Sequence, residues 1–394
     1  MLKAAAYRGE FHEFGGNGRL IFAESDCISD ELIRDYRGKV KLIYLDPPYC
    51  MSGGLEFQDS TARAAYDGIH AEEEHIAMLR KVLICCSDLL SMNGSIYVHV
   101  NPHMSGIIRM MMDEIFGKSN LMNEIIWTYK SGGRAIKHFS RKHDTILFYR
   151  KSKCVYFNIQ AAGIPRGSMN RNHMKQRVDE DGRIYFSIKS GGREYRYYED
   201  DKVFPSDVWT DIEYLHQRDP ERTGYAAQKP ESLLKRIISV SSEPDDIIMD
   251  LFGGSGTTAA VAAKMGRRFV TVDCGNAALL VMRRRFLNLE NPDGLFSLQK
   301  PFEIDYKAEP AILDAEQAEQ LIDIEAIRDG HSIRLCRSEK RGCAYAAVGI
   351  IVDGVFHARK YVTKPMRDEC LFVPYGYAIH LTDSECRQGI FTIS

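Results

Sequence analysis

The sequence lacks any run of about 18 apolar residues, which is the length that a helix needs to cross a bilayer. Residues 1–10 lack the apolar core and the cleavage site of a signal peptide. No Cys-x-x-Cys pair occurs among the ten cysteines, and such scattered thiols are typical of a reducing compartment. The histidines and cysteines show no spacing that predicts a metal site. We therefore expect a cytoplasmic protein with no membrane partner and no metal.

The chain also lacks a net charge of either sign, because 52 Lys and Arg oppose 54 Asp and Glu and give −2. This balance taken by itself argues against a nucleic-acid partner, but the charges are segregated along the sequence. Residues 129–153 carry eight bases and one acid, whereas residues 303–329 carry nine acids and two bases. Overall neutrality therefore excludes nothing, and the basic segment predicts a surface that contacts phosphates.

Short apolar runs alternate with helical periodicity, which is the order expected of an α/β protein with a parallel sheet. The predicted strands are residues 40–45, 95–100, 124–129, 145–150, 247–252 and 269–272. The predicted helices are residues 72–90, 257–265 and 276–289. Periodicity weakens in residues 151–227, whose Arg, Tyr, Gly and Asn are typical of an inserted recognition module. After residue 291 we expect an acidic helix over 311–327 and a hairpin over 349–358 that turns at Asp353-Gly354.

A glycine-rich turn connects a predicted strand to a predicted helix; it reads Asp250-Leu251-Phe252-Gly253-Gly254-Ser255-Gly256-Thr257-Thr258. Free N–H groups at a helix N-terminus bind polar or anionic ligands, and glycine lets the backbone approach them closely. No lysine precedes Thr257, so the turn is not a P-loop for nucleotide hydrolysis. Asp273 ends the next strand, where a carboxylate can bind ribose hydroxyls. The turn predicts a cofactor site, with a purely structural turn as the alternative.

The residues Asp46-Pro47-Pro48-Tyr49 follow the predicted strand 40–45, at the end where open α/β sheets bind their ligands. Prolines fix backbone φ angles, so the Asp46 carboxylate, the Pro47 carbonyl and the Tyr49 ring are held in one orientation. Two acceptors and a ring suit an exocyclic amine on a planar base. Accepting both amine hydrogens directs the nitrogen lone pair at an electrophile. A rigid exposed turn is the alternative for this motif by itself.

A DPPY turn that precedes an FGGSG turn resembles the β-group S-adenosylmethionine-dependent amino-methyltransferases of DNA. The chain looks most like the adenine-N6 enzymes of restriction–modification systems, including type III modification subunits. The resemblance covers about residues 20–290 and includes Ser25-Asp26, Gln228-Lys229-Pro230-Glu231, residues 94–99 and residues 143–149.

The resemblance implies a Rossmann-like methyltransferase fold: a mostly parallel twisted sheet with one antiparallel hairpin strand and helices on both faces. The implied division is a catalytic half in residues 1–150, a target-recognition region in 151–227, a cofactor half in 228–291 and a small α+β module of unknown role in 292–394.

The implied reaction is methyl transfer from S-adenosylmethionine to N6 of an adenine flipped out of double-stranded DNA, with Asp46, Pro47, Pro48 and Tyr49 as catalytic residues. The implied cofactor-binding residues are Asp26, Lys229, Asp250, Phe252, Gly253, Gly254, Ser255, Gly256, Thr257 and Asp273. We expect DNA contacts from Lys130, Arg134, Lys137, Arg141, Lys142, Arg166, Arg171, Arg193 and Arg196. A homodimer and a restriction subunit are further partners that the resemblance implies.

Other functions share some of these residues. Cytosine-N4 methyltransferases have the same fold but more often carry Ser at the position of Asp46. Enzymes that methylate RNA or a protein glutamine use related turns, but the motif order and the long basic insert argue against them. A catalytically silent DNA-binding or specificity protein needs neither DPPY nor FGGSG, and both are intact here.

Overall fold

The computed structural model describes residues 2–12, 17–48, 72–130, 135–166, 174–289, 302–326, 332–337, 343–362, 371–374 and 377–393. Three residues predicted to act in the site, Tyr49, Arg134 and Arg171, lie outside these ranges. Among the described helices, none has both the length and the apolar composition needed to cross a membrane.

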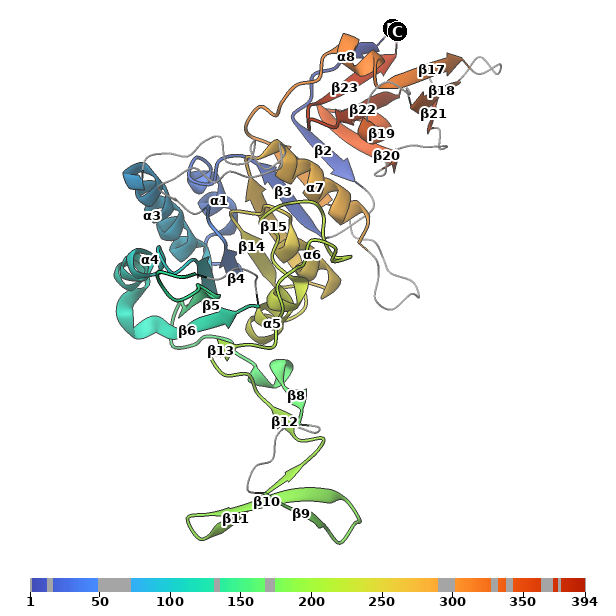
Figure 1. The fold of residues 1–394 in the computed structure, drawn as a ribbon. Coiled ribbons are helices and arrows are strands. Elements are labelled where there is room, and N and C mark those ends of the chain that lie inside the picture. The colour runs from blue at the N-terminus through green and yellow to red at the C-terminus, as the bar shows by residue number, and fades with distance from the viewer. Residues whose placement is uncertain are drawn as a thin grey trace.

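A twisted sheet forms the centre of the molecule (Figure 1). In spatial order its strands are β3 (Gly18–Phe22), β15 (Arg268–Asp273), β14 (Ile247–Asp250), β4 (Val40–Leu45), β5 (Leu90–Val100), β7 (His143–Arg150), β6 (Leu121–Thr128) and β13 (Val208–Trp209). Neighbouring strands are parallel from β3 to β5, whereas β7 runs antiparallel to both β5 and β6. The predicted Rossmann-like sheet with one antiparallel hairpin strand is confirmed.

Helices cover both faces of the sheet, so its central strands are buried on both sides. On β4 every residue is buried; Leu42 and Tyr44 enter one core cluster, and Ile43 and Leu45 enter another. The first cluster is completed by α5 (Glu231–Ser241), α6 (Thr257–Lys264) and α7 (Asn276–Leu287). The second is completed by α1 (Ser29–Tyr36), α3 (Glu72–Leu89) and α4 (Ser105–Met112), which continues into η1 (Asp113–Gly117) and η2 (Lys118–Asn120). Two-sided burial explains why residues 40–45 are almost continuously apolar.

The carboxyl ends of the parallel strands lie along one edge of this sheet. β4 ends immediately before Asp46, β14 ends at Asp250 before the glycine turn, and β15 ends at Asp273. Because β14 lies between β4 and β15, the three ends are neighbours. The two motifs therefore meet at one edge, although they are far apart in the sequence.

Part of the region predicted to recognise the target projects from the body of the molecule in Figure 1, whereas β13, which falls in the same predicted region, belongs to the central sheet. The projecting part begins at η3 (Ile159–Ala162), and the strands β8 (Ile164–Pro165) and β12 (Lys202–Val203) pair to form its narrow connection. Beyond them, β9 (Lys175–Val178), β10 (Ile184–Ser190) and β11 (Arg193–Tyr198) form an antiparallel sheet with β10 in the middle. All of β9 and most of β11 are exposed, so this sheet is a surface element.

The last part of the chain extends the central sheet. Beyond β3 the order continues with β16 (Phe302–Tyr306), β2 (Gly9–His12), β20 (Val355–Val362), β19 (Cys343–Val352), β22 (Ala378–Asp383), β23 (Gln388–Ile393) and β1 (Leu2–Ala4). The N-terminal strands β1 and β2 thus pair with C-terminal strands. The predicted division assigns residues 2–12 to the catalytic half, whereas backbone pairing joins them to the C-terminal module.

One predicted helix is wrong. Within the predicted range 311–327, the described residues 311–326 form the short helix α8 (Ala315–Glu319), and β17 (Ile322–Ala326) follows it. β17 pairs with β18 (Ser332–Arg337), which also pairs with β21 (Leu371–Pro374), so strand pairing overrides the helical spacing. The predicted hairpin is confirmed, because β19 and β20 are joined at Asp353 (φ 48°) and Gly354 (φ 75°), the backbone conformation of a tight hairpin turn.

Candidate active site

The carboxylate of Asp46 forms an ion pair with the ammonium of Lys229. These residues come from motifs 183 positions apart in the sequence, and Lys229 lies just before α5. Only 16% of the Asp46 side chain and 14% of the Lys229 side chain are exposed. Pro47 is buried and Pro48 is half-buried. The predicted catalytic carboxylate therefore contacts the turn that is predicted to line the cofactor site.

A chain of hydrogen bonds lies close to Asp46. The Tyr44 hydroxyl contacts His99 Nδ1 at 2.8 Å, and His99 Nε2 contacts the Asp144 carboxylate at 3.2 Å. Burial raises the pKa of Asp144, but the hydrogen bond from His99 and the charge of Lys229 outweigh burial and hold that pKa below its ordinary value. The sequence motifs do not predict these hydrogen bonds. The one local signal for them is a polar residue, His99, within the apolar run 95–100. The chain fixes β4, β5 and β7 to one another beside the catalytic turn.

The glycine turn is shaped by close packing. Gly254 has a left-handed φ of +51°, and a Cβ there would lie 3.1 Å from the ring of Tyr225. A Cβ at Gly253 would clash with Thr271 Oγ1. Helix α6 begins at Thr257, and Gly256 in the capping position before it provides no side-chain hydrogen bond, so the first N–H groups of the helix remain for other acceptors. The turn brings together the predicted residues Phe252, Gly253, Gly254, Ser255, Gly256 and Thr257 at the uncapped N-terminus of α6, and a polar cofactor fits such a position.

Two carboxyls, the buried Asp250 and the half-buried Asp273, hold this turn in place. Asp273 accepts hydrogen bonds from the N–H of Gly254 at 2.8 Å and from the N–H of Gly275 at 2.7 Å. Asp250 accepts from the Thr258 hydroxyl at 2.6 Å and from a backbone N–H in the turn. Burial raises the pKa of Asp273, and burial raises the pKa of Asp250 to about 7. Asp250 is therefore a support for the turn, whereas Asp273 lies where the chain leaves β15 for the helix.

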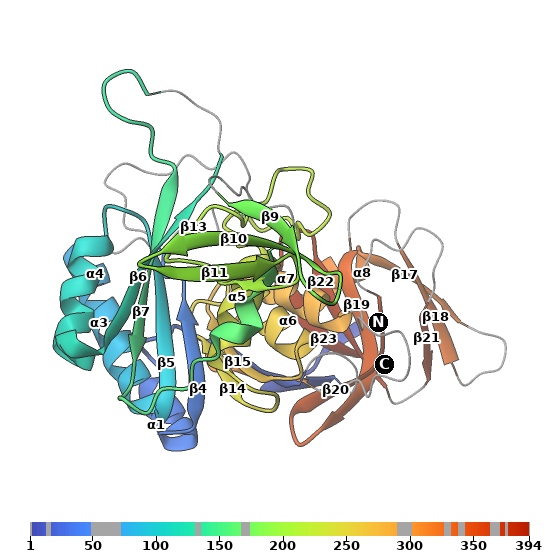
Figure 2. The same ribbon diagram turned by 90° about the horizontal axis from the view of Figure 1, so that it is seen from below.

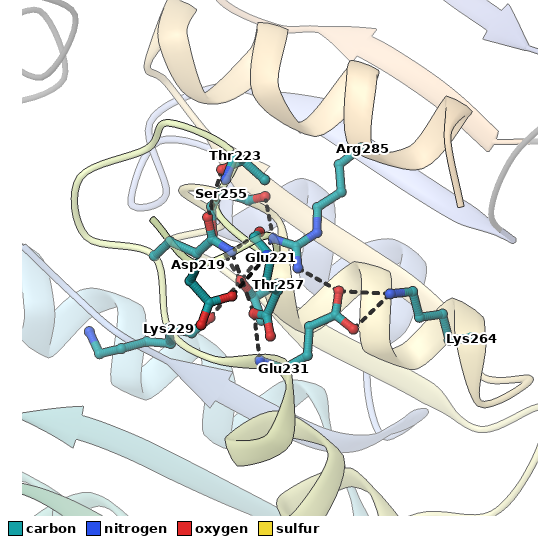
Figure 3. Close-up of polar contacts among 10 residues, drawn as sticks. Asp219, Glu221, Thr223, Lys229, Glu231, Ser255, Thr257, Lys264 and Arg285 are labelled. Atoms are coloured by element: carbon teal, nitrogen blue, oxygen red, sulfur yellow. Dashed lines mark hydrogen bonds and ion pairs between the residues drawn. The ribbon is translucent and has the colours of Figure 1, made fainter. Parts of the chain in front are cut away.

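A polar network joins the Lys229 turn to the glycine turn (Figure 3). Arg285 donates to the Glu231 carboxylate at 2.7 Å and to the Thr257 hydroxyl at 3.1 Å. Thr257 in turn donates to the backbone carbonyl of Lys229 at 3.1 Å. Lys264 also binds Glu231, at 2.7 Å. These contacts fix the position of Lys229 relative to the cofactor turn. The sequence motifs predict Thr257 and Lys229 as site residues, but they do not predict the roles of Glu231, Lys264 and Arg285.

Asp26 lies after β3, next to the same edge of the sheet. Its side chain is 19% exposed and approaches Lys81 at 3.5 Å. The neighbouring Ser25 donates a hydrogen bond to the carbonyl of Leu251, so this segment is fixed to the end of β14. Asp26 therefore belongs to the same edge as Asp273 and the glycine turn. Glu24, Asp26 and Cys27 offer ligand atoms within 4.8 Å of one another, but two of the three are exposed.

The residues predicted to bind DNA fall into two separate groups. Lys130, Lys137, Arg141 and Lys142 belong to the connection between β6 and β7. Arg166, Arg193 and Arg196 belong to the projecting recognition region. There the Arg166 guanidinium lies 4.4 Å from the centre of the Tyr197 ring, and Arg196 lies 4.9 Å from that of Tyr185. The structure thus offers two basic surfaces rather than one.

Comparison with known proteins gives matches over the same part of the chain. The sequence profile of the N6_N4_Mtase family, described as DNA methylase, matches residues 40–282. The type II methyltransferase M.EcaI of Enterobacter cloacae is 28% identical over 346 residues, which are 74% of this chain and 76% of that protein. The DNA adenine methyltransferase YhdJ of Escherichia coli (strain K12) is 29% identical over 277 residues, which are 69% of this chain and 84% of that protein.

Solved structures with low sequence identity also align. A complex of M1.HpyAVI with SAM covers 69% of this chain and 100% of its own, with a TM-score of 0.43 and 17% identity. The cytosine-N4-specific PvuII DNA methyltransferase covers 73% of this chain and 90% of its own, with a TM-score of 0.47 and 16% identity.

A mostly parallel sheet with both motifs at its carboxyl edge defines a methyltransferase of the Rossmann-like class. Because the matched profile spans more than half of its length, the chain belongs to the N6_N4_Mtase family of DNA methylases. It is an S-adenosylmethionine-dependent DNA methyltransferase of the restriction–modification type, as the motifs predict.

Proposed function

We propose that the chain methylates N6 of an adenine that is flipped out of double-stranded DNA at a specific sequence. The observation that carries the proposal is the position of Asp46, a carboxylate at the carboxyl edge that touches the cofactor turn through Lys229. Aspartate at this position favours adenine over cytosine, and the relative YhdJ is named an adenine methyltransferase. Cytosine N4, the base named for the PvuII enzyme, is the alternative.

In the proposed reaction Asp46 and the Pro47 carbonyl accept the two hydrogens of the exocyclic amine, and Tyr49 stacks on the base. These contacts orient the nitrogen lone pair toward the methyl group that S-adenosylmethionine supplies. The amine becomes acidic only as the new N–C bond forms, so Asp46 needs no unusual basicity to receive the proton. The protein thus acts mainly by orientation and hydrogen bonding.

We assign the cofactor to the residues that the sheet edge brings together. Asp273 is placed to bind ribose hydroxyls, Asp26 to contact the adenine end, and the glycine turn to hold the methionyl part. Lys229 links the two turns, because its ammonium pairs with Asp46 and its backbone carbonyl accepts a hydrogen bond from Thr257 in the cofactor turn.

Mapping modified bases tests the proposal. The intact chain is expressed in a host that has no DNA methylation, and the host genome is then sequenced for modified bases. We expect N6-methyladenine at one recurring sequence, because the recognition region reads DNA and Asp46 selects the amine. Finding N4-methylcytosine instead would show that cytosine is the substrate. An unmodified genome would contradict methylation altogether. This experiment does not test the predicted homodimer or the predicted restriction subunit.

The recognition sheet presents two chemically different faces, which strand register identifies. Ser187 on β10 lies opposite Lys175 on β9 and Arg196 on β11, and Tyr185 lies opposite Arg177. Since side chains alternate along a strand, these residues and Lys189 share one face. Ile184, Phe186 and Ile188 on β10 alternate with those residues, and Tyr195 lies opposite Ile188, so these four share the other face. We propose that the first face, rich in Lys and Arg, lies against DNA phosphates.

Neutralising the basic face should weaken DNA binding. In a chain with Arg177→Ala, Lys189→Ala and Arg196→Ala, we expect a lower DNA affinity and a smaller slope of log affinity against log salt concentration, by about 0.9 for each phosphate that is no longer neutralised. Arg37→Ala, which removes an exposed charge just before β4, at the opposite end of that strand from the catalytic turn, should change the slope little. Titration of a fluorescent duplex at several salt concentrations measures both quantities. Equal slopes for the triple variant and the wild type would contradict the assignment.

A further inference from the structure

Two large apolar side chains stand almost fully in solvent on the connection between β6 and β7. Ile136 and Phe139 are each 98% exposed, more than any other large apolar residue among those described; Met110, the next, is 74% exposed. The local backbone is nonetheless held, because the Ser140 hydroxyl accepts a hydrogen bond from the Ala135 N–H at 3.2 Å. Burial of such side chains is favourable, so their exposure indicates a surface that becomes covered by a partner.

The connection starts from the catalytic edge of the sheet. Its base is closed by a hydrogen bond from the Tyr129 N–H to the Lys142 carbonyl at 3.0 Å. The Tyr129 hydroxyl binds Asp144 at 3.3 Å, and Asp144 binds His99 in the chain next to Asp46. In Figure 2 the described part of this connection, residues 135–142, extends away from the rest of the molecule. The apolar pair is thus carried on an arm whose base lies beside the catalytic turn.

The charge around the pair indicates what covers it. Residues 129–143 contain five Lys and Arg and no Asp or Glu. Lys137 lies between the two apolar residues in the sequence, and Arg141 and Lys142 follow them. A polyanion whose interior is apolar matches this arrangement. Its phosphates can contact the Lys and Arg side chains of the connection, and its stacked nucleobases can contact Ile136 and Phe139. Double-stranded DNA, on which the family acts, has this chemistry.

We propose that Ile136 and Phe139 form a wedge that enters the DNA stack beside the target base and keeps that base out of the helix. The inference rests on the proposed function, in which the base must leave the duplex to reach Asp46. Apolar side chains that enter between base steps offset the cost of unstacking, and the cost of flipping is smallest for a base without a pairing partner. The wedge therefore matters for a paired target and matters little for an unpaired one.

The test compares two duplexes that carry the mapped target site. In one, the target base is paired; in the other, it lies opposite an abasic position. For Ile136→Ala/Phe139→Ala at saturating DNA, we expect the single-turnover rate on the paired duplex to fall about 10- to 100-fold, with a change of less than about threefold on the abasic duplex. Ile136→Leu/Phe139→Leu, which keeps apolar bulk, should retain most of the rate on both duplexes.

The control is Met92→Ala/Met110→Ala, which removes two exposed apolar side chains outside the arm and should leave both rates unchanged. An equal loss on both duplexes, or no loss on the paired duplex, would overturn the wedge. The wild-type rate on the paired duplex reports the proposed function separately. If the mapped base is cytosine, the same pair of duplexes is made with cytosine, and the ratio of rates tests the wedge in the same way.

Discussion

Asp46→Ala is expected to abolish methyl transfer while cofactor binding survives. Asp46 is the one carboxylate at the DPPY turn, and an alanine leaves the amine with the Pro47 carbonyl as its remaining acceptor there. Loss of a positioned acceptor and proton-receiving group costs about 10²- to 10⁴-fold in rate. The cofactor turn keeps its own supports at Asp250 and Asp273, so cofactor affinity should change little. Methyl transfer from labelled S-adenosylmethionine and calorimetric titration of the cofactor measure the two effects.

The control for Asp46→Ala is Asp88→Ala, which removes an exposed acid that pairs with Arg37 at 3.5 Å, near the opposite end of β4 from the catalytic turn. Its rate and cofactor affinity should equal those of the wild type. Asp46→Asn keeps the shape of the side chain and one acceptor oxygen, so an intermediate rate is expected. Turnover at the wild-type level in Asp46→Ala would rule out Asp46 as the group that orients the amine.

The sequence is most informative where one-dimensional patterns determine structure directly. The run 40–45 predicts a strand because helices bury both faces of β4, and residues 257–265 predict a helix that the structure gives as α6. The hairpin at Asp353-Gly354 is predictable because the turn needs two residues with positive φ. The meeting of the DPPY and glycine turns follows from the same logic, since parallel strands end at one edge.

Contacts between residues far apart in the sequence could not be predicted from it. The pairing of Asp46 with Lys229 depends on how α5 packs against the sheet, and the Tyr44–His99–Asp144 chain depends on the register of three strands. The pairing of β1 and β2 with C-terminal strands has no local mark. At residues 322–326 the sequence pattern predicts the wrong structure. The apolar residues have helical spacing, but pairing with β18 makes this segment a strand.

Asp273→Ala is expected to lower cofactor affinity by at least about 10- to 100-fold. The carboxylate holds the N–H groups of Gly254 and Gly275, and a hydrogen bond to a charged group contributes about 1.5–3 kcal/mol. Its removal leaves two backbone donors without this acceptor and removes the carboxylate proposed to bind ribose. Asp273→Asn should also bind weakly, because an amide has one acceptor oxygen where the site uses two. Calorimetric titration of S-adenosylmethionine gives the affinities.

The pH dependence of cofactor affinity tests whether the ionised carboxylate of Asp273 holds the cofactor site. Burial raises the pKa of this carboxyl, so lowering the pH protonates it earlier than an ordinary aspartate and removes acceptor capacity. Wild-type affinity should therefore fall on mild acidification, whereas the affinity of Asp273→Ala should vary less with pH. Asp246→Ala is the control, because Asp246 lies just before β14, at the opposite end of that strand, and approaches Lys41 at 3.9 Å. Wild-type affinity in Asp273→Ala, or the same loss in Asp246→Ala, would show that the carboxyl edge does not hold the cofactor through Asp273.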